Sequence, residues 1–150
     1  MEAGAPATAV EQERVIASLP EELRELGRHV LLGKFNRRGD PVGFHHAPGG
    51  RCPPGRRIKE ILERFPDGSY SARVLFLHPR FGWLEKAHPH TMFPDEWSSE
   101  KVMRVGMEAY RRRTEDWVDR WKSQASRPRI AGYHRRGRGP TTFYPDLGSR

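Results

Sequence analysis

Cysteine and long apolar segments are scarce in this sequence, and each shortage excludes a class of protein. Cys52 is the single cysteine among 150 residues, which excludes an internal disulfide bond and a cysteine-rich zinc site. No apolar run approaches the roughly 18 residues that span a membrane, so no membrane anchor is expected. Residues 1–8 contain neither a basic segment nor an apolar core, so the sequence predicts no signal peptide.

Acidic residues are also in the minority. The chain has 27 Lys and Arg against 19 Asp and Glu, which gives a formal net charge of +8. This excess favours a partner with dense negative charge: nucleic acid, an anionic membrane or an acidic protein. Hydrophobic residues make up only 35%, but four Trp, four Tyr and seven Phe supply large side chains for one core.

The pattern of apolar and turn residues predicts an α+β domain, with N-terminal helices followed by a mostly antiparallel sheet that one helix interrupts. Residues 1–17 are assigned to a leader, loose over 1–10, and the start of the N-terminal helix; residues 18–150 form the domain. Ser18 and Glu21 make a capping-box signature, and Gly27 is the expected end of that helix.

The other expected elements follow from turn residues and periodicity. They are a long ordered loop with short strand pieces at 29–55, a short helix at 56–65, strands at 70–77, 130–134 and 141–144, a strand leading into 91–94, and a helix from Ser98 to about Lys122. Trp117 and Trp121 would share one face of that last helix.

Histidines carry the clearest chemical signal. The chain has seven: His29, His45, His46, His78, His88, His90 and His134. Two imidazoles with near-neutral pKa values can act as general base and general acid, and His29 and His45 both lie in glycine-rich sequence. RNA carries its own nucleophile, the 2′-hydroxyl, so two histidines plus a Lys or Arg for the phosphorane charge suffice without a metal.

A metal site is the competing interpretation of the same residue type. His45, His46, His88 and His90 could supply three or four imidazole ligands. Pro89 restricts the geometry of its two neighbours, however, and no Asp or Glu lies close in a ligand-like pattern. We therefore expect no metal ligands and no cofactor.

Two further groups suit RNA binding. In the strand at 141–144, Thr142 and Tyr144 point to the same side, where two hydroxyls can bind a pyrimidine. Arg135, Arg136 and Arg138 lie at a hairpin tip, from which they can reach phosphates.

Four segments, in this order, resemble the bacterial EndoU nuclease family. They are HVLLG at 29–33, GFHH at 43–46, TMFPDEWS at 91–98 followed by Lys101-Val102, and TFYP at 142–145. The resemblance covers about residues 18–146 and implies a compact, barnase-like ribonuclease-toxin fold.

The resemblance also implies roles for individual residues. His29 and His45 match the acid–base pair, Thr142 and Tyr144 match the uridine site, and Gly33 and Gly43 match loop glycines that we assign to substrate binding. The implied reaction is metal-independent cleavage at uridine to a 2′,3′-cyclic phosphate and a 5′-hydroxyl.

Two assignments stay open between alternatives. The third catalytic group is a cation, either Lys86 or His90; Lys86 is favoured because its charge does not depend on a near-neutral pKa. Of the adjacent His45 and His46 only one can face the substrate, and the Gly-Phe-His pattern favours His45.

Together these features predict an endoribonuclease that acts as a bacterial toxin, with tRNA or another RNA as its target. It would be secreted or delivered into the cytoplasm of a target cell and held off by an acidic immunity protein. The alternatives are a non-catalytic basic RNA- or DNA-binding module on the same fold, and a metal-dependent hydrolase with histidine ligands.

Overall fold

Strands dominate residues 6–147, the part of the chain that the computed structural model describes. The helices are α1 (Pro6–Ser18), α2 (Glu21–Leu31), the short 3-10 helix η1 (Pro48–Gly50) and α3 (Ser99–Arg111). The strands are β1 (Lys34–Phe35), β2 (Pro41–Val42), β3 (Arg56–Arg64), β4 (Tyr70–His78), β5 (Gly82–Glu85), β6 (His90–Met92), β7 (Glu115–Asp116), β8 (Arg120–Ser123), β9 (Ile130–Arg135) and β10 (Gly139–Pro145). The α+β class is confirmed.

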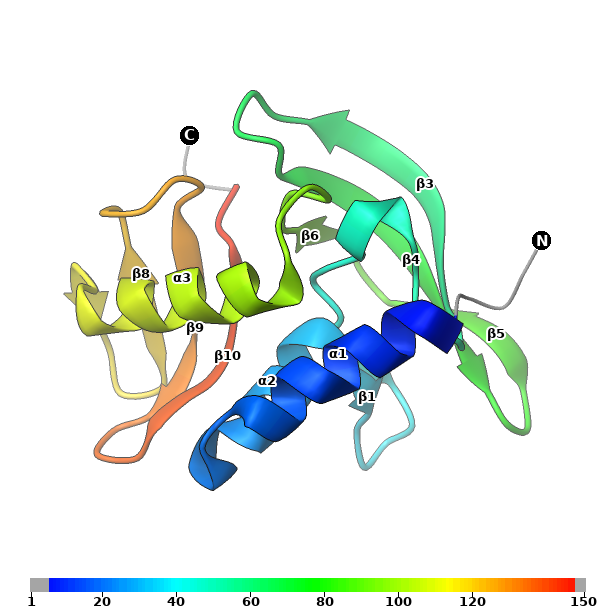
Figure 1. Cartoon of the computed structure of the whole chain (residues 1–150), viewed down its shortest axis with the longest axis horizontal. Helices are drawn as coiled ribbons and strands as arrows, with labels where there is room; N and C mark the ends of the chain where they lie inside the picture. The colour runs from blue at the N-terminus through cyan, green and yellow to red at the C-terminus, as the bar shows by residue number, and fades with distance from the viewer. Residues whose placement is uncertain (1–5, 148–150) are drawn as a thin grey trace.

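Figure 1 shows two antiparallel sheets, with β3 and β4 on the right and β8, β9 and β10 on the left, where α3 lies across them. The first has the order β3-β4-β5, with β6 paired to the other end of β4; the second has the order β10-β9-β8-β7. Strands β1 and β2 form a separate two-stranded ribbon. The end of β10 lies beside β6, so the two sheets meet where Thr91 Oγ1 donates to Pro145 O at 2.6 Å.

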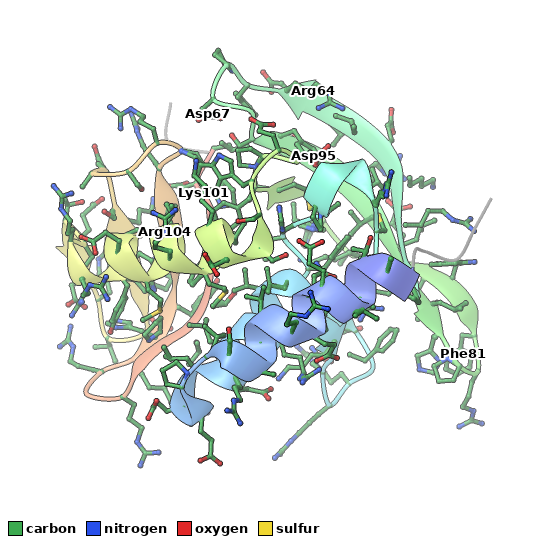
Figure 2. All side chains as sticks on the ribbon, viewed as in Figure 1. Arg64, Asp67, Phe81, Asp95, Lys101 and Arg104 are labelled. Atoms are coloured by element: carbon green, nitrogen blue, oxygen red, sulfur yellow. The ribbon has the colours of Figure 1, made fainter. Side chains whose placement is uncertain are left out.

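The larger core lies between the three α-helices and one face of the second sheet. α3 packs across that face, where Phe143 of β10, Trp121 of β8 and Ile130 of β9 are fully buried. Gly106 allows this close approach, because a Cβ there would lie 2.1 Å from the Phe143 ring. The opposite face of α3 carries exposed charges such as Arg104 (Figure 2).

The N-terminal helices differ from the prediction at their ends. Residues 6–10 belong to α1 rather than to a loose leader, and residues 1–5 lie outside the described residues. Ser18 ends α1 and bonds back to Val15 O, while Pro20 precedes α2 without a side-chain cap. Gly27 does not end the helix: it is buried inside α2, where Leu19, Ile16 and Met103 surround it. Helix packing, not the local glycine, decides where α2 ends.

The predicted helix at 56–65 is wrong, because these residues form β3. Nearly every residue of β3 pairs with β4, from Arg56 opposite Phe76 to Arg64 opposite Tyr70. Two bulges shift the register, so the apolar residues of β3 do not alternate and resemble a helical spacing in the sequence. Pairing with β4 makes residues 56–64 a strand, and the local pattern of apolar residues does not reveal that pairing.

The helix predicted from Ser98 to Lys122 is correct at its start and wrong at its end. Ser98 Oγ accepts a hydrogen bond from Lys101 N at 3.0 Å, as an N-cap should. α3 stops at Arg111, and β7 and β8 follow as a hairpin. Trp121 is therefore buried on β8, whereas Trp117 lies in the turn before it with 39% of its surface exposed.

Candidate active site

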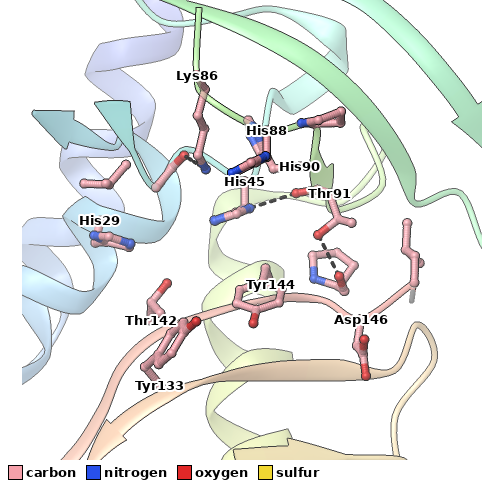
Figure 3. A pocket seen from close by; sticks show the side chains of 15 residues that line it. His29, His45, Lys86, His88, His90, Thr91, Tyr133, Thr142, Tyr144 and Asp146 are labelled. Atoms are coloured by element: carbon pink, nitrogen blue, oxygen red, sulfur yellow. Dashed lines mark hydrogen bonds between the residues drawn. The ribbon is translucent and has the colours of Figure 1, made fainter. Parts of the chain in front are cut away.

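A pocket of about 550 Å³ lies where the two sheets meet (Figure 3). Its walls come from the end of α2, the segment at 42–45, the segment at 86–91 and the strands β9 and β10. The polar side chains that line it include His29, His45, Lys86, His88, His90, Thr91, Tyr133, Thr142, Tyr144 and Asp146. Segments far apart in the sequence thus supply most of the residues predicted for the site.

The backbone at Gly43 and Phe44 brings two of the histidines together. Gly43 has φ +80° and Phe44 has φ +68°, two successive left-handed conformations. A Cβ at Gly43 would lie 2.2 Å from His29 O, so only glycine fits there. Phe44 N then donates to His29 O at 3.0 Å, and His45 N donates to Val30 O at 2.7 Å. This pairing with α2 holds the segment carrying His45 against the helix carrying His29.

His45 is almost fully buried, with 5% of its surface exposed, and lines the pocket. Its Nδ1 lies 2.8 Å from Thr91 O, and because a carbonyl only accepts, Nδ1 is the protonated nitrogen. Its ring centroid lies 5.6 Å from the Tyr144 ring and 5.0 Å from the His90 ring. Burial, with Lys86 nearby, holds the pKa of His45 well below its ordinary value.

His29 is half-buried near the end of α2 and lines the same pocket. Burial lowers its pKa to about 4, and the charges of Lys34 and Lys86 act in the same direction. At this pKa His29 is neutral at pH 7.

His46 does not share the pocket with His45. It is fully buried behind it, where Nε2 donates to Trp97 O at 2.8 Å and Nδ1 lies 3.5 Å from Ser99 Oγ. Burial lowers the pKa of His46 to about 4. Of the four histidines weighed as metal ligands, His45, His88 and His90 line the pocket and His46 is separated from them.

Both candidates for the cation line the pocket. Lys86 Nζ donates to Gly43 O at 3.2 Å, and burial lowers the pKa of Lys86 to about 8. His90 Nε2 donates to Phe44 O at 2.7 Å, and burial together with the Lys86 charge lowers the pKa of His90 to about 3. At pH 7 Lys86 is mostly charged and His90 is neutral.

Thr142 and Tyr144 face the pocket from β10, as strand alternation predicts, while Phe143 points into the core. Thr142 is buried, and its hydroxyl oxygen has no hydrogen-bond partner among the described residues. An unpaired buried hydroxyl at the wall of a pocket is a ready ligand for a polar group that enters it. Burial also raises the pKa of Tyr144, so its phenol stays protonated.

The other residues predicted to bind substrate, the three hairpin arginines and Gly33, do not line this pocket. Arg135 and Arg138 line an adjoining pocket of about 320 Å³ that also contains His29. Arg136 instead approaches Asp116 at 3.6 Å. Gly33 packs under the site, where a Cβ would meet Val42 O at 2.8 Å, so it shapes the loop and does not line the main pocket.

Sequence reasoning missed Tyr133 and Asp146 in the pocket wall and considered His88 only as a metal ligand. Tyr133 is the cross-strand partner of Thr142, so the correct pairing of β9 with β10 would have identified it. Among residues 6–147 no group of three His, Cys, Asp or Glu is arranged to hold a metal ion. No helix of the described part is long and apolar enough to cross a membrane.

Comparison with known proteins gives a family match over most of the chain. Residues 23–147 match the family described as Bacterial EndoU nuclease. The chain is also similar to a Bacillus cereus protein named Toxin, with 36% identity over 89 residues. That alignment covers 58% of this chain and 16% of the Bacillus protein, so the chain spans only a small part of that relative's length. No solved structure matches the chain significantly.

Proposed function

Because the chain belongs to the bacterial EndoU nuclease family, we propose that it is an endoribonuclease that cuts RNA at uridine without a metal ion. The observation that carries this proposal is that one pocket is lined by His29, His45, Lys86, Thr142 and Tyr144. Those residues supply a base, an acid, a cation and two hydroxyls, which is a complete set for attack by the 2′-hydroxyl.

His45 is suited to act as the general base. Since Thr91 O occupies Nδ1–H, the unprotonated Nε2 is the nitrogen able to accept the 2′-hydroxyl proton. The 2′-oxygen then attacks the adjacent phosphorus. Its new P–O bond forms as the P–O bond to the 5′-oxygen breaks, which leaves a 2′,3′-cyclic phosphate.

His29 is suited to act as the general acid that protonates the leaving 5′-oxygen. It is more exposed than His45, and the charge of a bound phosphate would favour its protonated form against the burial and the Lys34 and Lys86 charges that lower its pKa. A protonated His29 and a neutral His45 are then the starting state of the reaction.

Lys86 is the better candidate for the group that stabilises the phosphorane. Its charge lies in a low-dielectric site, where it stabilises developing negative charge more than it would in water. His90 is instead a positioning residue. Its hydrogen bond to Phe44 O supports the left-handed Phe44, which turns His45 into the pocket.

The uridine would bind against β10. The unpaired Thr142 hydroxyl can bond the edge of the base, and the Tyr144 ring can pack against the nucleotide beside His45. Arg135 and Arg138, which line the adjoining pocket at His29, would contact neighbouring phosphates.

The similarity to a Bacillus cereus protein named Toxin supports a role as the nuclease part of a toxin. Such a protein would be delivered to act on RNA in the cytoplasm of a target cell. An acidic immunity protein would fit the basic chain and could block the pocket.

The decisive test uses an oligonucleotide with one uridine, its 2′-deoxyuridine analogue, and excess EDTA. We expect cleavage of the first substrate with a cyclic phosphate at the new 3′ end, undiminished by EDTA, and no cleavage of the deoxy analogue. Binding of both without cleavage would indicate a non-catalytic RNA-binding module, and loss with EDTA would indicate a metal-dependent hydrolase.

Variants of the adjacent histidines supply the matched control. His29→Ala and His45→Ala should each slow cleavage by about 100-fold, the usual size for a lost acid or base. His46→Ala should lower stability, because it removes the bond to Trp97 O, but retain far more activity per folded molecule. An inactive, folded His46→Ala beside an active His45→Ala would contradict the assignment.

A further inference from the structure

One face of the second sheet, the open face, carries exposed side chains that no other described residue covers, and it continues directly from the pocket. The other face is covered by α3, against which Trp121, Ile130 and Phe143 are buried. Since side chains alternate along each strand, the neighbours of these buried residues point to the open face. Arg120, next to Trp121 on β8, and Tyr133, an odd number of positions after Ile130 on β9, both point to this face and are exposed.

Cross-strand pairing places these residues in a straight row. Tyr133 lies opposite Thr142 on one side and opposite Arg120 on the other. Trp117 follows in the β7–β8 turn, where its N donates to Arg120 O at 2.8 Å and its ring centroid lies 5.4 Å from the Arg120 guanidinium carbon. We name the row of Tyr133, Arg120 and Trp117, which starts at Thr142, the sheet track.

The composition of the sheet track differs from the rest of this face. Tyr133 is 44% and Trp117 39% exposed, so both rings offer free surface on which a base can stack. Arg120 forms no ion pair with another described residue. In the neighbouring row, by contrast, Lys122 lies 3.7 Å from the Asp146 carboxylate and opposite Glu115, so its charge is balanced.

We propose that the sheet track binds single-stranded RNA next to the uridine that is cut. Aromatic rings stack on unpaired bases, and an unpaired arginine between two rings attracts the connecting phosphate. The row crosses strands about 4.8 Å apart, so it is long enough for the nucleotides adjoining the cut and not for an extended duplex. In a duplex the bases are paired and stacked on one another, so they would not be available to the Tyr133 and Trp117 rings. This inference rests on the proposed function, because it extends the same substrate beyond the pocket.

The test compares Arg120→Ala and Trp117→Ala on two substrates: a uridine-containing dinucleotide and a single-stranded octamer with one uridine. We expect each variant to lower the ratio of kcat/KM for the octamer over that for the dinucleotide by about tenfold, in line with the loss of one stacked base or one phosphate contact. Trp117→Phe and Arg120→Lys should restore most of the ratio, since they keep a ring and a charge.

Binding of the uncleavable deoxyuridine octamer, followed by fluorescence anisotropy, separates this inference from the proposed function. Arg120→Ala should reduce the slope of log Kd against log salt by about 0.7, the value for one phosphate contact to a single strand. This binding measurement does not require cleavage. If the wild-type protein cleaves nothing, the proposed function is wrong, but the salt slope still shows whether the sheet track binds RNA.

The controls are an exposed arginine and an exposed aromatic residue that lie away from the sheet track. Arg104 is exposed on α3 behind the sheet, and Phe81 is 69% exposed at the β4–β5 turn (Figure 2). Arg104→Ala and Phe81→Ala should leave the substrate ratio and the salt slope unchanged. Equal losses of kcat/KM on both substrates would overturn the inference. Wild-type values in the track variants would also overturn it and would indicate that the open face binds a protein instead.

Discussion

His45 and His46 are neighbours in the sequence and have opposite surroundings. His45 lines the pocket with one nitrogen held by Thr91 O, whereas His46 is buried behind it and bonded to Trp97 O. Both histidines are buried, and burial outweighs the bond to the backbone carbonyl, so the neutral form of each is the one that the fold stabilises. The two histidines differ in where the second ring nitrogen lies. That of His45 faces the pocket, which suits a chemical role, and that of His46 faces the core, which suits a structural one.

The first residue-scale prediction concerns the charge of Lys86. Because burial lowers its pKa to about 8, Lys86 is charged below that pH and loses its charge above it. If Lys86 stabilises the phosphorane, kcat/KM should fall as the pH rises through about 8. Lys86→Ala should lower kcat by about 100-fold, the usual cost of removing a group that stabilises the transition-state charge.

Lys86→Arg separates this role from general packing, because an arginine keeps its charge at high pH. It should retain activity and flatten the alkaline limb of the profile measured from pH 6 to 10. Lys101→Ala, on α3 beside Trp97, serves as a control and should leave the profile unchanged. An alkaline limb that is identical in the wild type and Lys86→Arg would rule out Lys86 as the titrating cation.

At the scale of elements, the contact of α3 with β10 positions the two hydroxyls of the site. Phe143 lies between Thr142 and Tyr144 and packs against Gly106 of the helix. The direction in which β10 presents its hydroxyls therefore depends on how closely α3 approaches the sheet.

Gly106→Ala should destabilise the protein although alanine is the better helix former. The added Cβ would lie 2.1 Å from the Phe143 ring, and overpacking of this kind costs about 1–3 kcal/mol, more than the helix-propensity gain of about 0.5–1 kcal/mol. Thermal unfolding followed by circular dichroism should show a lower Tm. Arg104→Ala on the exposed side of the same helix should not. An unchanged or higher Tm in Gly106→Ala would show that Phe143 can move at little cost.

At the scale of the whole molecule, buried neutral histidines make the fold sensitive to acid. The folded pKa values of His29 and His46 are about 4 and that of His90 is about 3, all below the ordinary value of 6.5. The unfolded chain therefore binds more protons below pH 6.5, and stability is lost as the pH falls toward the folded pKa values.

Urea unfolding at pH 7.5, 6.0 and 5.0 checks this expectation. The free energy of unfolding should be nearly constant above pH 7 and should fall below about pH 6.5, by at most about 1.4 kcal/mol per pH unit for each histidine. His46→Gln removes one of these groups and should make the decline shallower. Equal stability at pH 7.5 and 5.0 would show that the histidines are protonated in the folded state.

The sequence by itself determined the features that depend on local patterns. Alternation identified the strand at 70–77 and placed Thr142 and Tyr144 on one side of β10, and the N-cap at Ser98 marked the start of α3. These succeeded because a strand's period and a cap's hydrogen bond involve residues only a few positions apart. The segments GFHH and TFYP also named His45 and Tyr144 before any geometry was known.

Only the tertiary structure decided the features that depend on distant partners. Residues 56–64 form a strand because β4 supplies the pairing, and α3 ends at Arg111 because β7 and β8 pair with the sheet beyond it. Likewise, the left-handed backbone at Gly43 and Phe44, held by α2, turns His45 into the pocket and His46 away from it. Burial against this segment sets the pKa values of Lys86 and His90, and burial is a property of the assembled fold that no spacing in the sequence encodes.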